Sequence, residues 1–141
     1  MKTKIIFLFS LFLPMVSCGK TTGLKRGDDY RTMWNYFEKE KIDPVECKDY
    51  VLYKENGRAH AIRRSDDYRT IEEIRSYPLV TLTKTTFDIY VAGMTVFEIV
   101  EHFGIPDSTK SSSCYFFYSI DGKSAGSIHF IHDDTHIFHA T

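Results

Sequence analysis

The sequence predicts an α+β fold in which short helices pack on one face of an antiparallel sheet. Two observations support this prediction. Helical patterns with clear capping residues occur between short runs of β-branched and aromatic residues. A tight-turn signal at Asn56-Gly57 joins two of these runs, which favours an antiparallel hairpin over parallel βαβ units.

The first 17 residues have the layout of a secretory signal peptide. Lys2 and Lys4 precede an apolar run over residues 5–16, which is shorter than the roughly 20 residues of a membrane span. The run ends at Ser17-Cys18-Gly19, and a small residue directly before a cysteine resembles a bacterial lipobox. This resemblance implies that residues 1–17 are a lipoprotein signal peptide, that Cys18 is acylated, and that Gly19 favours the outer membrane. The alternative is an ordinary signal peptide with an incidental cysteine.

Charge and length limit the function classes of the mature chain. Removing residues 1–17 leaves 124 residues, enough for one small domain, with 16 basic residues against 19 acidic ones. A slightly acidic chain without a basic block argues against nucleic-acid binding. It also offers no polybasic patch for anionic lipid, so membrane attachment would depend on the acyl chains at Cys18.

Two cysteines, Cys47 and Cys114, remain when Cys18 is acylated. An exported protein meets an oxidising compartment, where such a pair can form a disulfide. Spacing alone does not bring their Cα atoms within bonding range. A disulfide and two separate buried thiols therefore both remain open.

The segment from Gly19 to Gly27 is polar and aperiodic and is interpreted, with Cys18, as a tether over residues 18–27. Asp28-Asp29 then begins a helix, because acidic residues suit the positive end of the helix dipole. An aromatic stripe follows at helical spacing and is interpreted either as core or, less favoured, as a binding face. Its members are Tyr30, Met33, Trp34 and Phe37.

Residues 49–64 are predicted to form a hairpin, with Val51 opposite Ile62 and Glu55 opposite Arg58. Residues 65–67 are predicted to cap a second helix that ends at Pro78. The pentapeptide at residues 28–32 recurs at residues 66–70, through duplication or through convergence of two helix starts.

The second half is predicted to begin with strands at residues 79–83 and 87–92. Thr95 and Glu98 then have the spacing of a capping box, and Gly104 and Pro106 end the helix that follows. After a polar loop at residues 107–113, strands are predicted at residues 114–120, 126–132 and 135–139.

This second half resembles the SmpA/OmlA (BamE-like) family of bacterial lipoproteins. The resemblance rests on Gly93-Met94-Thr95, Glu98-Ile99, Phe103-Gly104-Ile105-Pro106 and the aromatic strand Tyr115-Phe116-Phe117-Tyr118. The wider group includes β-lactamase inhibitor protein, whose fold repeats the helix-then-sheet unit twice. The resemblance implies a single α+β domain over residues 28–141, with an extension at 28–84 and the family unit at 85–141. An alternative is that the extension completes a second related unit.

The resemblance implies a non-enzymatic, lipid-anchored envelope protein that contacts a protein partner and takes no cofactor. The alternative is a periplasmic inhibitor or immunity lipoprotein that neutralises a hydrolase or toxin. Aromatic residues are enriched in binding hot spots, so the candidate contact residues are Trp34, Phe37, Tyr115 and Phe117.

Four histidines lie near the C-terminus, and a two-residue turn at Asp133-Asp134 would place His129 and His136 on one face and His132 and His139 on the other. A zinc site needs three or four converging ligands, so two histidines on each face favour an ordinary sheet surface over a metal site. The sequence has no Gly-x-Ser-x-Gly elbow and no phosphate-binding glycine loop.

Overall fold

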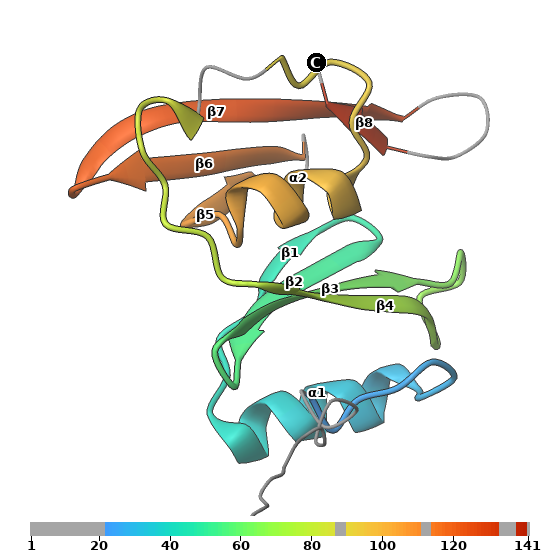
Figure 1. Cartoon of the computed structure of the whole chain (residues 1–141). Coiled ribbons are helices and arrows are strands. Elements are labelled where there is room, and N and C mark those ends of the chain that lie inside the picture. Colours follow the sequence, from blue (N-terminus) through green and yellow to red (C-terminus); the bar gives the residue numbers. More distant parts are fainter. Residues whose placement is uncertain (1–21, 87–89, 111–113, 133–137, 141) are drawn as a thin grey trace, which may run out of the picture.

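The structure is a computed structural model that describes residues 22–86, 90–110, 114–132 and 138–140 (Figure 1). Within these ranges, each half of the chain consists of one helix followed by four strands. The first half contains α1 (Tyr30–Glu40), β1 (Val45–Cys47), β2 (Tyr50–Glu55), β3 (Arg58–Arg64) and β4 (Ile71–Pro78). The second contains α2 (Val96–Phe103), β5 (Ser108–Lys110), β6 (Tyr115–Ile120), β7 (Lys123–His132) and β8 (Phe138–Ala140).

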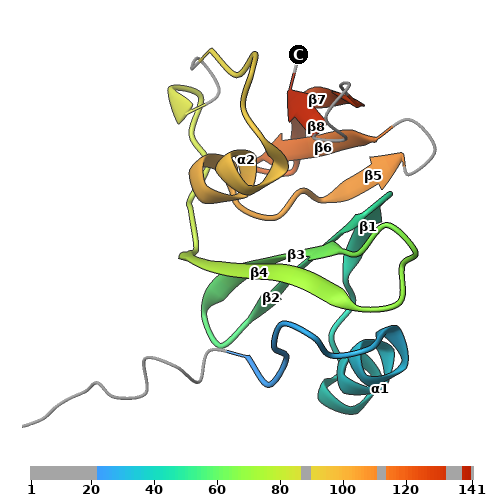
Figure 2. The same ribbon diagram turned by 90° about the vertical axis from the view of Figure 1, so that its right-hand side faces the viewer.

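Two antiparallel sheets and two helices alternate as four layers. Sheet 1 has the strand order β1-β2-β3-β4, and sheet 2 has the order β5-β6-β7-β8. Both views show α1 at one end, followed by sheet 1, α2 and sheet 2 (Figures 1 and 2). The predicted α+β class is confirmed. The arrangement differs in one respect from helices on one face of a single sheet, because α2 lies between two sheets.

Helix α1 forms as its cap predicts. The Asp29 side chain accepts a hydrogen bond from the backbone N–H of Thr32, and Lys41 closes the helix in the left-handed region. Met33 and Phe37 are buried against one face of sheet 1, in a cluster completed by Leu24, Val51, Tyr53, Ile62 and Ile71. Met33 and Phe37 are therefore core, the interpretation that the periodicity favoured, whereas Trp34 is partly buried and Tyr30 is 48% exposed.

The hairpin of β2 and β3 has the predicted register, with Val51 paired to Ile62 and Glu55 to Arg58. Asn56 and Gly57 both have positive φ, 54° and 72°, as a tight turn between right-twisted strands requires. Successive residues of β2 face opposite sides of the sheet. Val51 and Tyr53 therefore face α1, whereas Tyr50 and Leu52 face α2.

The prediction of a helix over residues 65–78 is wrong, because this segment forms a turn followed by strand β4. The Ser65 hydroxyl donates to Asp67 and accepts from the Thr70 N–H, and Tyr68 has a φ of 61° that ends any helical path. The helix was predicted because Ile71 and Ile74 are three residues apart, a spacing that places two side chains on the same face of a helix. A bulge at Arg63/Arg64 changes the alternation, so both isoleucines join the α1 side of sheet 1.

The two copies of the repeated pentapeptide adopt different conformations and lie side by side. The first begins α1, whereas the second forms the turn before β4. Asp29 and Thr70 form an isolated antiparallel bridge, and the Tyr30 N–H donates to the Arg69 carbonyl at 2.8 Å. The interpretation of both copies as helix starts is therefore wrong.

Several connecting segments also differ from the prediction. Residues 79–83 form no strand, and of the strand predicted at 87–92, residues 90–92 are irregular while 87–89 lie outside the described residues. The polar stretch predicted as a loop contains β5, and β1 was not predicted. Both β1 and β5 are three-residue edge strands, which carry too few alternating apolar residues to give a pattern.

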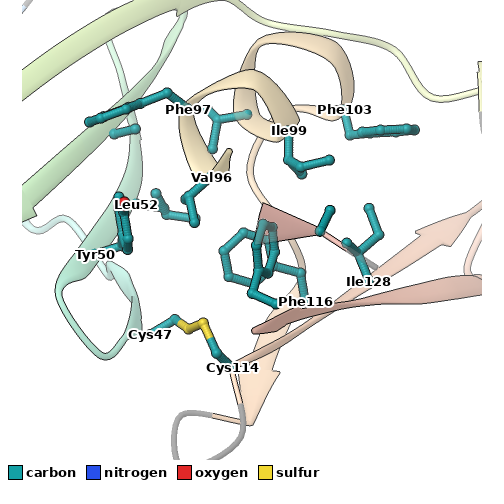
Figure 3. Packing of buried hydrophobic residues seen from close by; sticks show 14 of the residues in the cluster. Cys47, Tyr50, Leu52, Val96, Phe97, Ile99, Phe103, Cys114, Phe116 and Ile128 are labelled. Carbon is teal, nitrogen blue, oxygen red and sulfur yellow. A yellow bond between two sulfur atoms is a disulfide. The ribbon is translucent and has the colours of Figure 1, made fainter. Parts of the chain in front are cut away.

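Helix α2 has both expected ends and is buried on more than one side. Thr95 and Glu98 form a complete capping box, and Gly104 follows with a φ of 80°. Its apolar residues pack against Tyr50 and Leu52 of sheet 1 and against Phe116 and Ile128 of sheet 2 (Figure 3). A short helix with apolar residues on several sides fits this position between two sheets, and those residues are Val96, Phe97, Ile99, Val100 and Phe103.

The predicted tether is shorter than residues 18–27. Leu24 is buried with α1 and sheet 1, and the Gly27 N–H donates to the Ile71 carbonyl at 2.9 Å. Residues 22–27 therefore belong to the folded domain.

Candidate interaction surface

The outer face of sheet 2 carries a row of side chains that the core does not cover. Strands β6 and β7 alternate, so Phe116, Tyr118, Ile128 and Phe130 point inward and are buried. The residues between them point to the opposite side and are half-buried or exposed. We name this surface the outer face and define it by Tyr115, Phe117, Ser127, His129 and Ile131.

Three rings stack on the outer face. Tyr115 of β6 lies directly opposite His129 of β7, and the ring centroids are 4.2 Å apart with an interplanar angle of 11°. Tyr115 also stacks on Phe117, with ring centroids 6.1 Å apart. Phe117 and Ile131 remain 36% and 50% exposed. This arrangement presents a rigid aromatic and aliphatic surface, the kind that supplies contact energy at protein interfaces.

Two of the contact candidates named from the sequence, Tyr115 and Phe117, lie on the outer face together with two residues that were not named. Tyr115 and Phe117 were named for their aromatic character, whereas His129 and Ile131 were not named as contact residues. The signal was present in the alternation of β7, where Ser127, His129 and Ile131 share one side.

The other two contact candidates do not form a comparable surface. Phe37 is 2% exposed and lies 4.8 Å from the Tyr53 ring in the core between α1 and sheet 1. Trp34 is half-buried and makes an edge contact with Phe37 at 5.4 Å. The proposal of Phe37 as a contact residue is therefore wrong, because α1 turns that side chain toward sheet 1.

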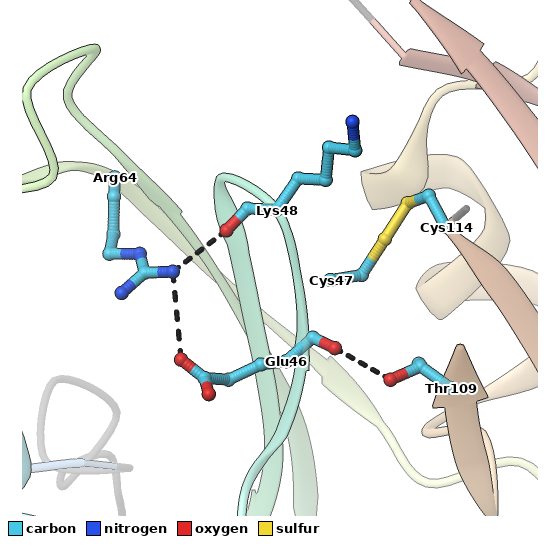
Figure 4. Close-up of a disulfide and its surroundings, with 6 residues drawn as sticks. All are labelled: Glu46, Cys47, Lys48, Arg64, Thr109 and Cys114. Atoms are coloured by element: carbon cyan, nitrogen blue, oxygen red, sulfur yellow. Dashed lines mark hydrogen bonds and ion pairs between the residues drawn. A yellow bond between two sulfur atoms is a disulfide. The ribbon is translucent and has the colours of Figure 1, made fainter. Parts of the chain in front are cut away.

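Cys47 and Cys114 form a disulfide, with their Cα atoms 5.3 Å apart (Figure 4). Both residues are buried. Beside the disulfide, the Thr109 hydroxyl of β5 donates to the Glu46 carbonyl of β1 at 2.6 Å. Arg64 lies on the other side of β1, where it donates to the Lys48 carbonyl and pairs with the Glu46 carboxylate at 3.6 Å. The disulfide and the Thr109 hydrogen bond join sheet 1 to sheet 2, whereas the Arg64 contacts hold β1 within sheet 1.

The residues that carry the family resemblance hold the scaffold together. The Gly93 N–H donates to the Ala140 carbonyl, and the Ala140 N–H donates to the Met94 carbonyl at 2.7 Å, so the start of α2 is paired with the end of β8. Gly93 has a φ of 89°, a conformation that favours glycine. Thr95 and Glu98 cap α2 as described above.

The end of α2 is fixed by a buried hydrogen bond. The Tyr118 hydroxyl of β6 donates to the Gly104 carbonyl at 3.0 Å, and burial raises the pKa of this hydroxyl. Pro106 is buried and precedes Asp107, whose N–H donates to the Phe117 carbonyl. Gly104 and Pro106 therefore position the turn between α2 and β5.

The histidine arrangement differs from the expected register. Ile131 pairs with His139 and His132 with Phe138, which requires a longer connection than a two-residue turn at Asp133-Asp134. His136 lies outside the described residues. Within the described part of the chain, no group of three or more His, Cys, Asp or Glu side chains converges as metal ligands would.

A separate cleft of about 940 Å³ lies between the end of α1, β1 and the turn before β5. Its lining includes three carboxylates that already have local partners. Glu46 pairs with Arg64, Glu55 accepts from the Tyr36 hydroxyl, and Asp107 accepts from Ser119. These contacts tie the three carboxylates into the fold, and Glu40 and Asp43 also line the cleft.

One buried polar side chain, His60 of β3, was not singled out from the sequence. Its exposed fraction is 0%, and its ring stacks on Tyr53 at 4.8 Å. Nε2 lies 3.0 Å from the Glu55 carbonyl, which only accepts, so Nε2 carries the proton. Nδ1 then accepts from the Ser76 hydroxyl at 2.7 Å. Burial lowers the pKa of His60 and keeps it neutral, which indicates a structural role.

Cys18 lies outside the described residues, so its acylation stays a prediction. No helix in the described ranges is long and apolar enough to cross a membrane. Comparison of the chain with protein-family models, with curated proteins and with solved structures gave no match.

Proposed function

We propose that this chain is a lipid-anchored protein of a bacterial cell envelope that acts by binding another protein rather than by catalysis. The observation that supports binding is the outer face of sheet 2, where Tyr115, Phe117 and His129 stack and Ile131 is exposed. Such rings lose little conformational entropy on binding, because their neighbours already hold them in place.

Two features support the envelope location. The leader and the lipobox-like Ser17-Cys18 are typical of a protein that is exported and acylated. A buried disulfide between Cys47 and Cys114 fits an oxidising compartment. The resemblance of residues 93–139 to the SmpA/OmlA family favours the same location, because it implies an outer-membrane lipoprotein with a protein partner.

Photo-cross-linking in the native host tests the binding surface. A photoreactive amino acid at Phe117 or Ile131 is expected to give a discrete cross-linked envelope protein. Tyr68 is a matched control, since it is a similarly exposed aromatic residue, 47%, on the turn before β4. Equal cross-linking from Tyr68 and Phe117, or none from the two outer-face positions, would contradict the proposal.

Metabolic labelling with a fatty acid tests the anchor separately. Label is expected in the wild-type chain and is expected to disappear in Cys18→Ala, because acylation requires the thiol of that residue. Label that persists in Cys18→Ala would overturn the assignment of the anchor to this residue.

A second candidate function is an inhibitor or immunity lipoprotein. One observation favours it: each half of the chain has a helix followed by a four-stranded antiparallel sheet, the doubled arrangement that the resemblance to β-lactamase inhibitor protein implies. The identity of the cross-linked partner separates the two functions. A hydrolase or toxin whose activity falls when the purified chain is added would support inhibition, whereas an envelope-assembly protein would support the first proposal.

A further inference from the structure

The folded domain begins very close to the proposed lipid anchor. Thr22 is the first described residue, and four peptide units link it to Cys18. A fully extended chain advances at most about 3.6 Å per residue, so these units span no more than about 14 Å. The distance between the acylated residue and the folded domain is therefore limited by covalent geometry alone.

Thr22 and the residues after it lie beside α1, where α1 packs on sheet 1; we call α1 and residues 22–27 the α1 layer. The Thr22 hydroxyl lies 2.9 Å from the Tyr53 hydroxyl, and the Gly23 N–H donates to the Tyr36 hydroxyl at 2.8 Å. Leu24 is 5% exposed in the cluster between α1 and sheet 1. The Tyr36 hydroxyl also donates to Glu55, which connects the segment to the β2–β3 turn. The segment cannot leave this layer without exposing Leu24.

The outer face of sheet 2 lies at the opposite end of the molecule. In Figure 1 the segment that follows Thr22 lies beside α1 at one end, and β7 and β8 lie at the other, with sheet 1 and α2 between them. Packed layers are about 10 Å apart, so the outer face is about 30 Å from α1. The link from Cys18 to Thr22 spans at most about 14 Å, so it is too short to place the acylated residue beside the outer face, about 30 Å from α1.

We propose that the α1 layer lies against the lipid headgroups and that the outer face of sheet 2 points into the aqueous space. This inference rests on the proposed anchor at Cys18. The occupant of the α1 side is the bilayer that holds the acyl chains, because the short link keeps the two within contact distance. The outward side of α1 is polar and suits headgroups rather than hydrocarbon; its exposed residues include Arg31, Asn35, Glu38 and Lys39.

This orientation determines how the partner is reached. A partner bound to Phe117 and Ile131 would approach from the aqueous side, about 30 Å from the α1 layer. Sheet 2 would then be the part of the domain farthest from the bilayer, held at a fixed distance by the packed layers below it. The anchor and the binding surface are separated by two intervening layers, sheet 1 and α2.

The chain contains a single tryptophan, Trp34, and it lies on α1, which provides a native probe of orientation. The acylated full-length protein is reconstituted into phosphatidylcholine–phosphatidylglycerol vesicles that carry a dansyl-labelled headgroup. Energy transfer from tryptophan to dansyl is then measured. The double variant W34F/F117W moves the donor to the outer face, and W34F/I131W does so at a second exposed position. Circular dichroism verifies that each variant is folded.

Transfer from Trp34 is expected to be several-fold more efficient than transfer from either outer-face donor. Equal or reversed efficiencies in the acylated protein would overturn the orientation while leaving the anchor intact. Absence of the acyl chain would overturn both the anchor and the orientation. A Gly-Ser insertion of about 20 residues after Gly19, with an r.m.s. length of about 25 Å, is expected to reduce transfer from Trp34 without changing acylation. Unchanged transfer after the insertion would also contradict the role of the short link.

Discussion

Cys47 at the end of β1 and Cys114 before β6 are 67 residues apart in the chain, and their disulfide joins sheet 1 to sheet 2. The adjacent hydrogen bond from Thr109 to the Glu46 carbonyl crosses the same boundary. Helix α2 connects the two sheets a second time, through apolar contacts with both. The disulfide, this hydrogen bond and the shared core therefore all hold the two halves together.

Removing the disulfide is expected to destabilise the domain by about 4 kcal/mol, because closing a 67-residue loop restricts the unfolded chain. The test compares the urea unfolding of the mature chain with that of its Cys47→Ala/Cys114→Ala form. Both proteins carry Cys18→Ala, so that no third thiol is present.

Reduction provides the control for this prediction. Dithiothreitol is expected to lower the urea midpoint of the disulfide-containing protein and to leave the double variant unchanged. A midpoint that is insensitive to both reduction and substitution would show that the shared core alone joins the halves.

His60 is expected to make the stability of the domain fall as the pH drops below about 6.5. Burial lowers its folded pKa below the ordinary 6.5, so the unfolded state binds a proton first as the pH falls. The contribution of the neutral His60 ring to the free energy of unfolding is therefore present above pH 6.5 and is lost as the pH falls below that value. At one pH unit below that value, the free energy of unfolding is lower by about 1.4 kcal/mol when the folded ring stays neutral.

The matched control is His60→Gln, which keeps a donor and an acceptor but does not titrate. The free energy of unfolding is measured in urea at pH 7 and pH 5.5. The wild-type protein is expected to lose about 1 kcal/mol more than the variant over this interval. Equal losses in both proteins would mean that His60 does not produce the pH dependence.

Local signals in the sequence predicted some elements well. The Asp29 cap, the Asn56-Gly57 turn and the Thr95/Glu98 capping box each depend on contacts within a few residues, and each forms as predicted. The outer face could be predicted only in part. The four aromatic residues of β6, Tyr115 to Tyr118, are consecutive in the sequence, and only their burial in the folded chain alternates.

Non-local pairing explains what the sequence did not predict. The bulge at Arg63/Arg64 places Ile71 and Ile74 on one side of a strand, although their spacing is that of a helix. Ser65 and Asp67 bond within a turn, using the same side-chain chemistry that caps helices. The disulfide pairing also depends on how the two sheets meet, which residue spacing does not specify.

Thr95→Ala is expected to destabilise the protein by about 1 kcal/mol, because the Glu98 N–H loses its side-chain acceptor at the start of α2. Thr95→Ser keeps the hydroxyl and is expected to retain most of the stability. Thermal unfolding of the two variants is compared with that of wild type. Equal destabilisation by alanine and serine would show that the capping hydrogen bond is not the cause.

Tyr118→Phe is expected to cost about 1–3 kcal/mol, because the buried Gly104 carbonyl loses the hydroxyl that donates to it. The ring still fills the core, so the loss measures the hydrogen bond rather than a cavity. Tyr30→Phe is the matched control, since Tyr30 is 48% exposed on α1. Urea unfolding is expected to show a lower midpoint for Tyr118→Phe only. A midpoint unchanged in both variants would indicate that water or another donor satisfies the Gly104 carbonyl when the hydroxyl is removed.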